Sequence, residues 1–184
     1  MKEFLIQNQY RILTILLLLG NFYLLPITAD EAYYFSWGKQ ISFGYYDHPP
    51  LIGWITSLTN TSTLRLPFLF ATLLFAMIAK EQVLGKLLFI PGVHLLLGGA
   101  LPDTLMVLSG FLVIHYFKIW ASSSTIINAI ILGITTAILG YSKFHGILLV
   151  FALAIGFWSK RKEWTLYLAI AITALALILS LIHI

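Results

Sequence analysis

The sequence contains no cysteine and very few charged residues. The absence of cysteine excludes disulfide bonds and thiolate metal sites. Charged residues make up only 10% of the 184 positions, whereas a soluble globular domain has about 25%. So few charges cannot cover a water-facing surface, and a lipid bilayer is the expected solvent. The net charge of +4 does not indicate nucleic-acid binding, because the basic residues form no stripe.

Hydrophobic residues are abundant, at 60%, and aromatic residues reach 15%. Trp and Tyr concentrate at membrane interfaces, and a transmembrane helix needs roughly 20 apolar residues, within a range of about 17 to 25. We predict an all-α fold, a polytopic transmembrane helical bundle of about seven short spans that forms a single module over residues 1–184. The predicted spans are Tyr10–Thr28, Leu64–Ala79, Leu84–Ala100, Thr104–Trp120, Thr125–Gly140, His145–Ser159 and Trp164–Ile182.

The distribution of basic residues predicts an orientation. With a cytoplasmic N-terminus, eight of the 11 basic residues fall inside and three fall outside, as the positive-inside rule expects. The three outer ones are Lys39, Arg65 and Lys143. We therefore expect a multi-pass protein of the cell membrane whose first loop, about residues 29–63, faces the outside.

This outer loop is the longest polar stretch of the chain. Asp30 is expected to cap a helix that runs to about Ile41, and the aromatic residues of that helix suit the headgroup layer. Pro49 and Pro50 favour extended backbone before a short apolar segment, Leu51–Leu58, which is too short to span the membrane.

Four acids fall on the outer side: Asp30, Glu31, Asp47 and Asp103. Paired carboxylates can deprotonate a hydroxyl group or hold a divalent cation. An acid as close to the hydrocarbon as Asp103 is costly and suggests a function. The simpler interpretation is that Asp30 and Asp103 cap helices, while Glu31 and Asp47 are solvated. Both interpretations stay open at this point.

Basic residues accompany these acids. Lys143, in a short break between two spans, and Arg65 could each bind a phosphate or simply extend toward the headgroups. His48, beside Asp47, and His145 fall on the same side. His94 and His115 lie within apolar spans, where hydrogen bonding between helices is the expected role.

The run from Ala29-Asp30-Glu31 through Asp47-His48-Pro49-Pro50-Leu51 resembles the first outer loop of the protein mannosyltransferase-like glycosyltransferases. These enzymes belong to the GT-C superfamily, and the lipid A aminoarabinose transferase is a relative. Arg65-Leu66-Pro67, Pro102-Asp103 and Ser142-Lys143 follow in the same order as in that family. The resemblance begins at about Tyr10 and covers the rest of the chain. Family members continue for several hundred residues, so the chain resembles their N-terminal module.

The resemblance implies an inverting membrane glycosyltransferase of the cell envelope. It would transfer a sugar from a polyprenyl-phosphate donor to an acceptor on the non-cytoplasmic face. Membrane lipids and a second chain or C-terminal half would be its partners. The implied roles are base for Asp30, assistance or acceptor binding for Asp103, second acid for Glu31, lipid-phosphate binding for Lys143, His48 and Arg65, and divalent-metal coordination for Asp47. Many family members have Lys where this chain has His48, which would make that contact pH-sensitive.

Two other functions stay open. In the first, the chain is a non-catalytic lipid-binding or transport subunit whose outer charges bind a lipid headgroup. In the second, it is a cation-coupled transporter that uses Asp103. The second is less favoured, because transporters bind their substrates near the midplane of the membrane and these acids lie at its outer face.

Overall fold

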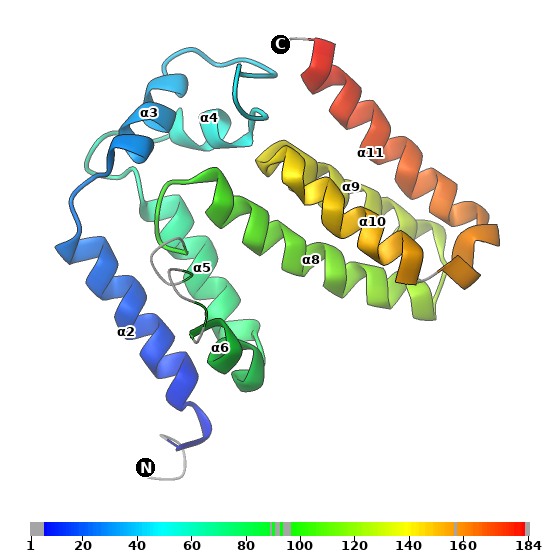
Figure 1. Ribbon diagram of the computed structural model, residues 1–184, viewed down its shortest axis with the longest axis horizontal. Coiled ribbons are helices and arrows are strands. Elements are labelled where there is room, and N and C mark those ends of the chain that lie inside the picture. Colours follow the sequence, from blue (N-terminus) through cyan, green and yellow to red (C-terminus); the bar gives the residue numbers. More distant parts are fainter. Residues whose placement is uncertain (1–5, 89, 91–92, 94–96, 157, 183–184) are drawn as a thin grey trace.

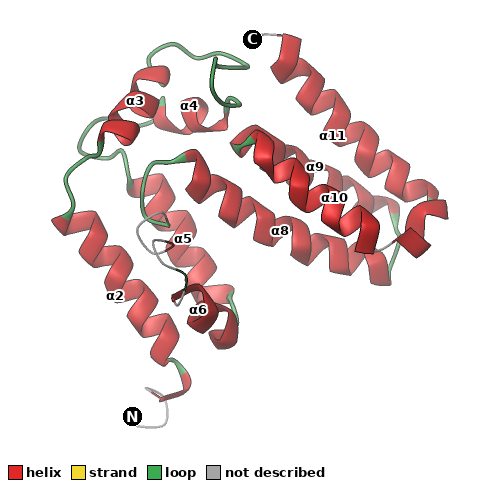
Figure 2. Ribbon diagram, in the orientation of Figure 1, coloured by secondary structure: helices red, strands yellow, loops and turns green. Residues whose placement is uncertain are grey.

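The computed structural model describes residues 6–88, 90, 93, 97–156 and 158–182. Within these residues the chain forms helices joined by turns and loops, with no strand (Figure 2). The predicted all-α fold is therefore confirmed. Two groups of helices form the body of the molecule, and two short helices lie across one end of it (Figure 1).

The N-terminal group contains α2 (Gln9–Leu24), α5 (Leu66–Ile78) and α6 (Glu81–Leu88). Its core is formed by Leu18 and Leu69, together with Leu97 from the turn before α8. At the end remote from α3, the Arg11 guanidinium donates hydrogen bonds to the carbonyls of Ala76 (3.0 Å) and Ala79 (2.9 Å). These bonds satisfy carbonyl groups that the C-terminus of α5 leaves without helical partners.

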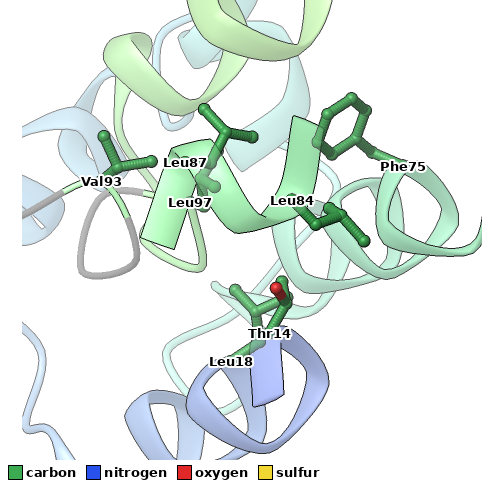
Figure 3. A pocket seen from close by; sticks show the side chains of 7 residues that line it. All are labelled: Thr14, Leu18, Phe75, Leu84, Leu87, Val93 and Leu97. Carbon is green, nitrogen blue, oxygen red and sulfur yellow. The ribbon is translucent and has the colours of Figure 1, made fainter. Parts of the chain in front are cut away.

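A small apolar cavity of about 10 Å³ lies within this group, between α2, α5 and α6 (Figure 3). Its wall carries one hydroxyl, from Thr14, among otherwise aliphatic and aromatic side chains. A cavity of this size holds one water molecule at most, and a water needs at least two polar partners. We therefore regard it as a packing defect.

The C-terminal group contains three long helices and several short segments. Its elements are α8 (Pro102–Ser122), α9 (Ile126–Ser142), η1 (Phe144–Gly146), α10 (Ile147–Gly156), η2 (Trp158–Lys162) and α11 (Trp164–Ile182). Helix α9 packs between α8 and α11. A Cβ atom on Gly133 would lie 2.9 Å from the carbonyl oxygen of Ala169, so this glycine permits the close approach of α9 and α11.

Two short helices, α3 (Ala29–Trp37) and α4 (Leu51–Thr56), cross the end of the bundle near the start of α8 (Figure 1). Helix α3 turns away from α2 by 81°. Its N-cap is Thr28, whose side chain forms a reciprocal capping box with Glu31. The expectation that Asp30 caps a helix running to Ile41 is thus wrong, because Thr28 holds that position and the helix ends at Trp37.

Helices α3 and α4 approach each other closely. A Cβ atom on Gly38 would lie 2.6 Å from the backbone nitrogen of Ser57. The Thr56 hydroxyl donates to the carbonyl of Tyr34 (3.2 Å), and the Trp54 indole donates to that of Ser42 (2.8 Å). These contacts hold α4 against α3 and against the loop between them.

The helices are shorter than seven membrane spans would require. In the described part, α8 is long and apolar enough to cross a membrane, and α2 with α3 would count as one more if their bend were part of a single broken span. The segments Leu66–Ile78, Ile126–Ser142, Phe144–Ile155 and Trp164–Ile178 are apolar but shorter. The prediction of seven spans is therefore not confirmed.

The predicted span Leu84–Ala100 is not a single helix. Helix α6 ends at Leu88, and residues 97–101 form turns and bends. The Gly98-Gly99 pair lies in these turns and bends, and glycine disfavours a helix interior. Residues 89, 91–92 and 94–96, and with them His94, lie outside the described part of the chain.

Candidate functional site

A buried ion pair joins Glu31 on α3 to Arg65, the residue before α5. The guanidinium binds the carboxylate through two bonds, Nε to Oε1 at 2.6 Å and Nη2 to Oε2 at 2.5 Å. Glu31 Oε1 also accepts from the backbone nitrogen of Ala100 (3.0 Å), and Oε2 accepts from that of Thr28 (2.9 Å). Both oxygens are therefore fully engaged. Glu31 is 1% exposed, so the interpretation of this acid as solvated is wrong.

The remaining donors of Arg65 bind the C-terminal end of α2. Nη1 donates to the carbonyls of Leu25 (2.7 Å) and Asn21 (3.5 Å), and Nη2 donates to that of Pro26 (2.6 Å). Together with the two bonds to Glu31, these contacts occupy all five N–H groups of a guanidinium. No donor is left for a phosphate, so Arg65 is withdrawn from the predicted phosphate-binding residues.

The electrostatics of Glu31 follow from these contacts. Burial is the largest influence and would raise the pKa of its carboxyl group. Hydrogen bonds from Arg65, Thr28 and Ala100, with the charge of Arg65, outweigh burial, so the pKa is lowered from 4.5. The ionised Glu31 and its partner Arg65 together join α2, α3, α5 and the turn before α8. The enclosed Glu31 carboxylate cannot reach a sugar acceptor.

A second ion pair joins Asp103 to Lys143, and it is more open. The Lys143 ammonium lies 2.7 Å from Asp103 Oδ1, and the two side chains are 19% and 34% exposed, respectively. Asp103 lies in the first turn of α8, whose N-cap is Leu101, so the expectation that Asp103 is an N-cap is wrong. Lys143 is the residue that ends α9. The pair thus connects the start of one helix to the end of the next.

Aromatic side chains of α3 hold the third acid and its neighbour. The Tyr33 hydroxyl donates to Asp47 Oδ2 at 2.6 Å, and this bond, the largest influence, raises the pKa of Tyr33. The His48 ring stacks on Tyr34 with centroids 5.5 Å apart and meets Trp37 edge-on at 6.2 Å. Asp47 is exposed and His48 is half-buried.

Tyr34 lies within the electrostatic reach of all three outer aspartates. Burial, and then the charges of Asp30, Asp103 and Asp47, raise the pKa of its phenol. These three carboxylates come from α3, the following loop and α8, and they act on one side chain. Asp30 itself is exposed and accepts no hydrogen bond from any residue in the described part of the chain. It is therefore open to a ligand.

Two further histidines lie away from these acids. His145 is exposed on η1, two residues after Lys143. His115, on α8, is exposed and its ring contacts Tyr116, and the hydrogen bond between helices that was expected for it is not found among the described residues. Sequence reasoning missed Tyr33 and Tyr34 as contacts of Asp47 and His48. The spacing Thr28-x-x-Glu31 is the capping-box pattern and could have identified Glu31 as a structural acid.

Asp47 is the residue for which a metal role is predicted. Its carboxylate accepts a hydrogen bond from the Tyr33 hydroxyl. Within the described residues, no three His, Asp or Glu side chains gather into a metal-binding group, and the metal role of Asp47 stays a prediction. We therefore assign no step to a metal.

Comparisons with protein-family models, with curated proteins and with solved structures find no match for this chain. The resemblance of residues 29–51 to the GT-C enzymes thus stands on its motifs alone.

Proposed function

We propose that this chain is the catalytic module of a membrane glycosyltransferase that uses a polyprenyl-phosphate sugar. The observation that carries the proposal is the accessible Lys143–Asp103 pair at the start of α8, together with the exposed Asp30 on α3. In this proposal, transfer from a lipid phosphate uses the carboxylate of Asp30 and the ammonium group of Lys143. Such a reaction needs a base for the acceptor and a cation for the leaving group.

In the proposed reaction, the Asp30 carboxylate takes the proton of an acceptor hydroxyl. The acceptor oxygen then forms a bond to the anomeric carbon from the side opposite the phosphate. The bond between that carbon and the phosphate oxygen breaks, and its electron pair leaves with the lipid phosphate. The result is an inverted glycoside, a protonated Asp30 and a free polyprenyl phosphate.

Lys143 stabilises the charge that develops on the leaving phosphate. An ammonium group has three donors, and the bond to Asp103 uses one of them. Asp103 therefore acts as a positioning residue that orients Lys143 while leaving donors for the phosphate. His48, stacked on Tyr34, is a second phosphate ligand in this proposal.

The proposal needs a membrane location, which the exposed apolar side chains support. On α9, Ile127, Ile130, Ile134 and Ile138 recur at helical spacing and are all exposed. Soluble monomers rarely expose contiguous apolar patches larger than a few hundred Å². We propose that the bundle is multi-pass, with Asp30, Asp103 and Lys143 on the non-cytoplasmic side.

The test is a transfer assay with the protein in lipid vesicles. Polyprenyl-phosphate mannose and polyprenyl-phosphate aminoarabinose serve as donors, and the release of polyprenyl phosphate is measured with and without a membrane extract as the acceptor source. Asp30→Asn should lower the rate by about 10² to 10⁴-fold, the usual effect of removing a general base. Donor binding should persist, because the phosphate is held by other residues.

Lys143→Ala should weaken donor binding by about ten- to a hundred-fold, the effect of losing a hydrogen bond to a charged group. Lys39→Ala is the matched control, because Lys39 lies on the same side but contacts the Phe35 ring. If the wild-type protein binds both donors but releases no polyprenyl phosphate, the enzyme proposal fails. The non-catalytic lipid-binding subunit then replaces it.

A further inference from the structure

A larger cavity lies away from the carboxylates, among α8, α9, α10 and α11. Its volume is about 480 Å³, within the range of about 300 to 1,000 Å³ that ligand pockets occupy. Most of its wall is apolar, with Phe117 and Trp120 on α8 and Val150 on α10. Lys160, in η2, is the one charged side chain among the described residues that line it.

The cavity follows the axis of α11. Leu166 and Leu177 both line it and lie eleven residues apart, which at the helical rise corresponds to about 16 Å. The hydrocarbon core of a bilayer is about 30 Å thick, so the cavity extends through about one leaflet. Lys160 precedes α11 and lies at the Leu166 end, where a headgroup would meet the one charge that the described residues place on this wall.

Hydroxyl groups on the wall are already bonded to the protein. The Thr136 hydroxyl donates to the carbonyl of Leu132 (2.7 Å), and that of Thr173 donates to the carbonyls of Ala169 (3.0 Å) and Gly133 (3.2 Å). These contacts leave the middle of the cavity suited to a hydrocarbon chain.

The cation at its end is available for binding. Lys160 forms no ion pair with any residue that the structure describes. It is half-buried and belongs to the basic run Lys160-Arg161-Lys162. A lysine of this kind extends its ammonium group to the level of the lipid headgroups, where it attracts anionic lipids.

We propose that this cavity binds one tail of an anionic phospholipid, with the lipid phosphate at Lys160. The observations that carry this assignment are a leaflet-long apolar cavity and a lysine at one end that forms no ion pair with the described residues. The inference shares the membrane location with the proposed function but does not depend on glycosyl transfer, because lipid retention is measured without any sugar donor.

The first test fills the cavity. The protein is reconstituted in vesicles of equal phosphatidylglycerol and phosphatidylcholine with identical acyl chains, extracted in mild detergent, and analysed by native mass spectrometry. Wild type should retain one phosphatidylglycerol molecule. Ala174→Phe, on the cavity wall, should lower that retention about tenfold. Ala171→Phe is the matched control, because Ala171 lies one turn away on α11, is exposed and does not line the cavity.

The second test removes the charge and keeps the fold. Lys160→Gln should reduce the preference for phosphatidylglycerol about fivefold, the factor for losing one interfacial lysine. Lys162→Gln, an exposed lysine outside the cavity wall, should leave the preference unchanged. Equal phosphatidylglycerol retention in wild type, Ala174→Phe and Lys160→Gln overturns the proposal. So does a lipid-free dimer, which would assign the cavity to a second copy of the chain.

Discussion

The two ion pairs at the candidate site differ in how completely they are enclosed. In the Glu31–Arg65 pair, the side chains are 1% and 10% exposed and every polar atom has a partner within the chain. In the Asp103–Lys143 pair, one oxygen meets one ammonium group, and both side chains remain accessible. The enclosed pair can only hold segments together, whereas the open pair has donors and acceptors left for a ligand.

The same contrast separates two adjacent residues of α3. Successive residues of a helix point about 100° apart, so Asp30 and Glu31 cannot face the same way. Glu31 points into the bundle toward Arg65, and Asp30 remains exposed. An acidic pair in the sequence thus divides into a buried structural acid and an acid that is exposed.

The largest expected effect is on the free energy of unfolding. It comes from removing the cation of the buried pair and is compared with removing the cation of the accessible pair. Arg65→Met leaves Glu31 buried without its partner, and breaking a buried pair typically costs about 3 to 5 kcal/mol. Lys143→Met breaks an accessible ion pair, and the expected loss of unfolding free energy is about 0 to 1 kcal/mol. Denaturant unfolding of the two variants in detergent micelles measures both differences.

A double variant, Glu31→Gln with Arg65→Met, provides the control for this comparison. It removes both charges, so it should recover part of the stability that Arg65→Met loses, because no buried charge remains unpaired. Equal destabilisation by Arg65→Met and Lys143→Met would show that the two pairs do not differ in the way described.

The next effect is a pH dependence of folding stability that arises from Glu31 in the enclosed pair. The pKa of Glu31 is lowered on folding, so its contribution to stability is complete above about pH 4.5 and is lost as the pH falls through the folded value. The stability difference between wild type and Glu31→Gln should therefore narrow on acidification below about pH 4.5. Thermal unfolding in detergent over a pH series measures this difference, and one that stays constant down to pH 3 would contradict the prediction.

Much of the fold follows from patterns in the sequence. The apolar runs around α8, α9 and α11 predicted those helices to within a few residues, because long hydrophobic segments bounded by polar residues or Pro leave little choice. The prediction of one span over Leu84–Ala100 is wrong, because α6 ends at Leu88 and the Gly98-Gly99 pair lies in turns and bends. Hydrophobic content alone does not show whether a segment is helical.

The candidate site was harder to predict, because residue type does not reveal a partner. Arg65 and Lys143 were both expected to bind phosphate, and both lie beside an acid on another element. Only the three-dimensional arrangement shows that Glu31 and the end of α2 take up every donor of Arg65 while Lys143 keeps some free. Contacts between residues 34 and 40 positions apart in the chain leave no local pattern from which they could be inferred.

The smallest expected effect extends the comparison to an exposed acid, Asp47. Its carboxylate accepts a hydrogen bond from the Tyr33 hydroxyl, which stabilises the neutral phenol and raises the pKa of Tyr33 above 10.0. Asp47→Asn removes the negative charge, so the pKa of Tyr33 should fall toward 10.0. Titration of protein labelled with ¹³C-tyrosine, followed by NMR, measures the shift, with Tyr33→Phe identifying the resonance among nine tyrosines. Overall stability should hardly change, because both side chains lie in solvent. An unchanged Tyr33 pKa would mean that Asp47 is as open in solution as Asp30, and both would then be available to the substrate.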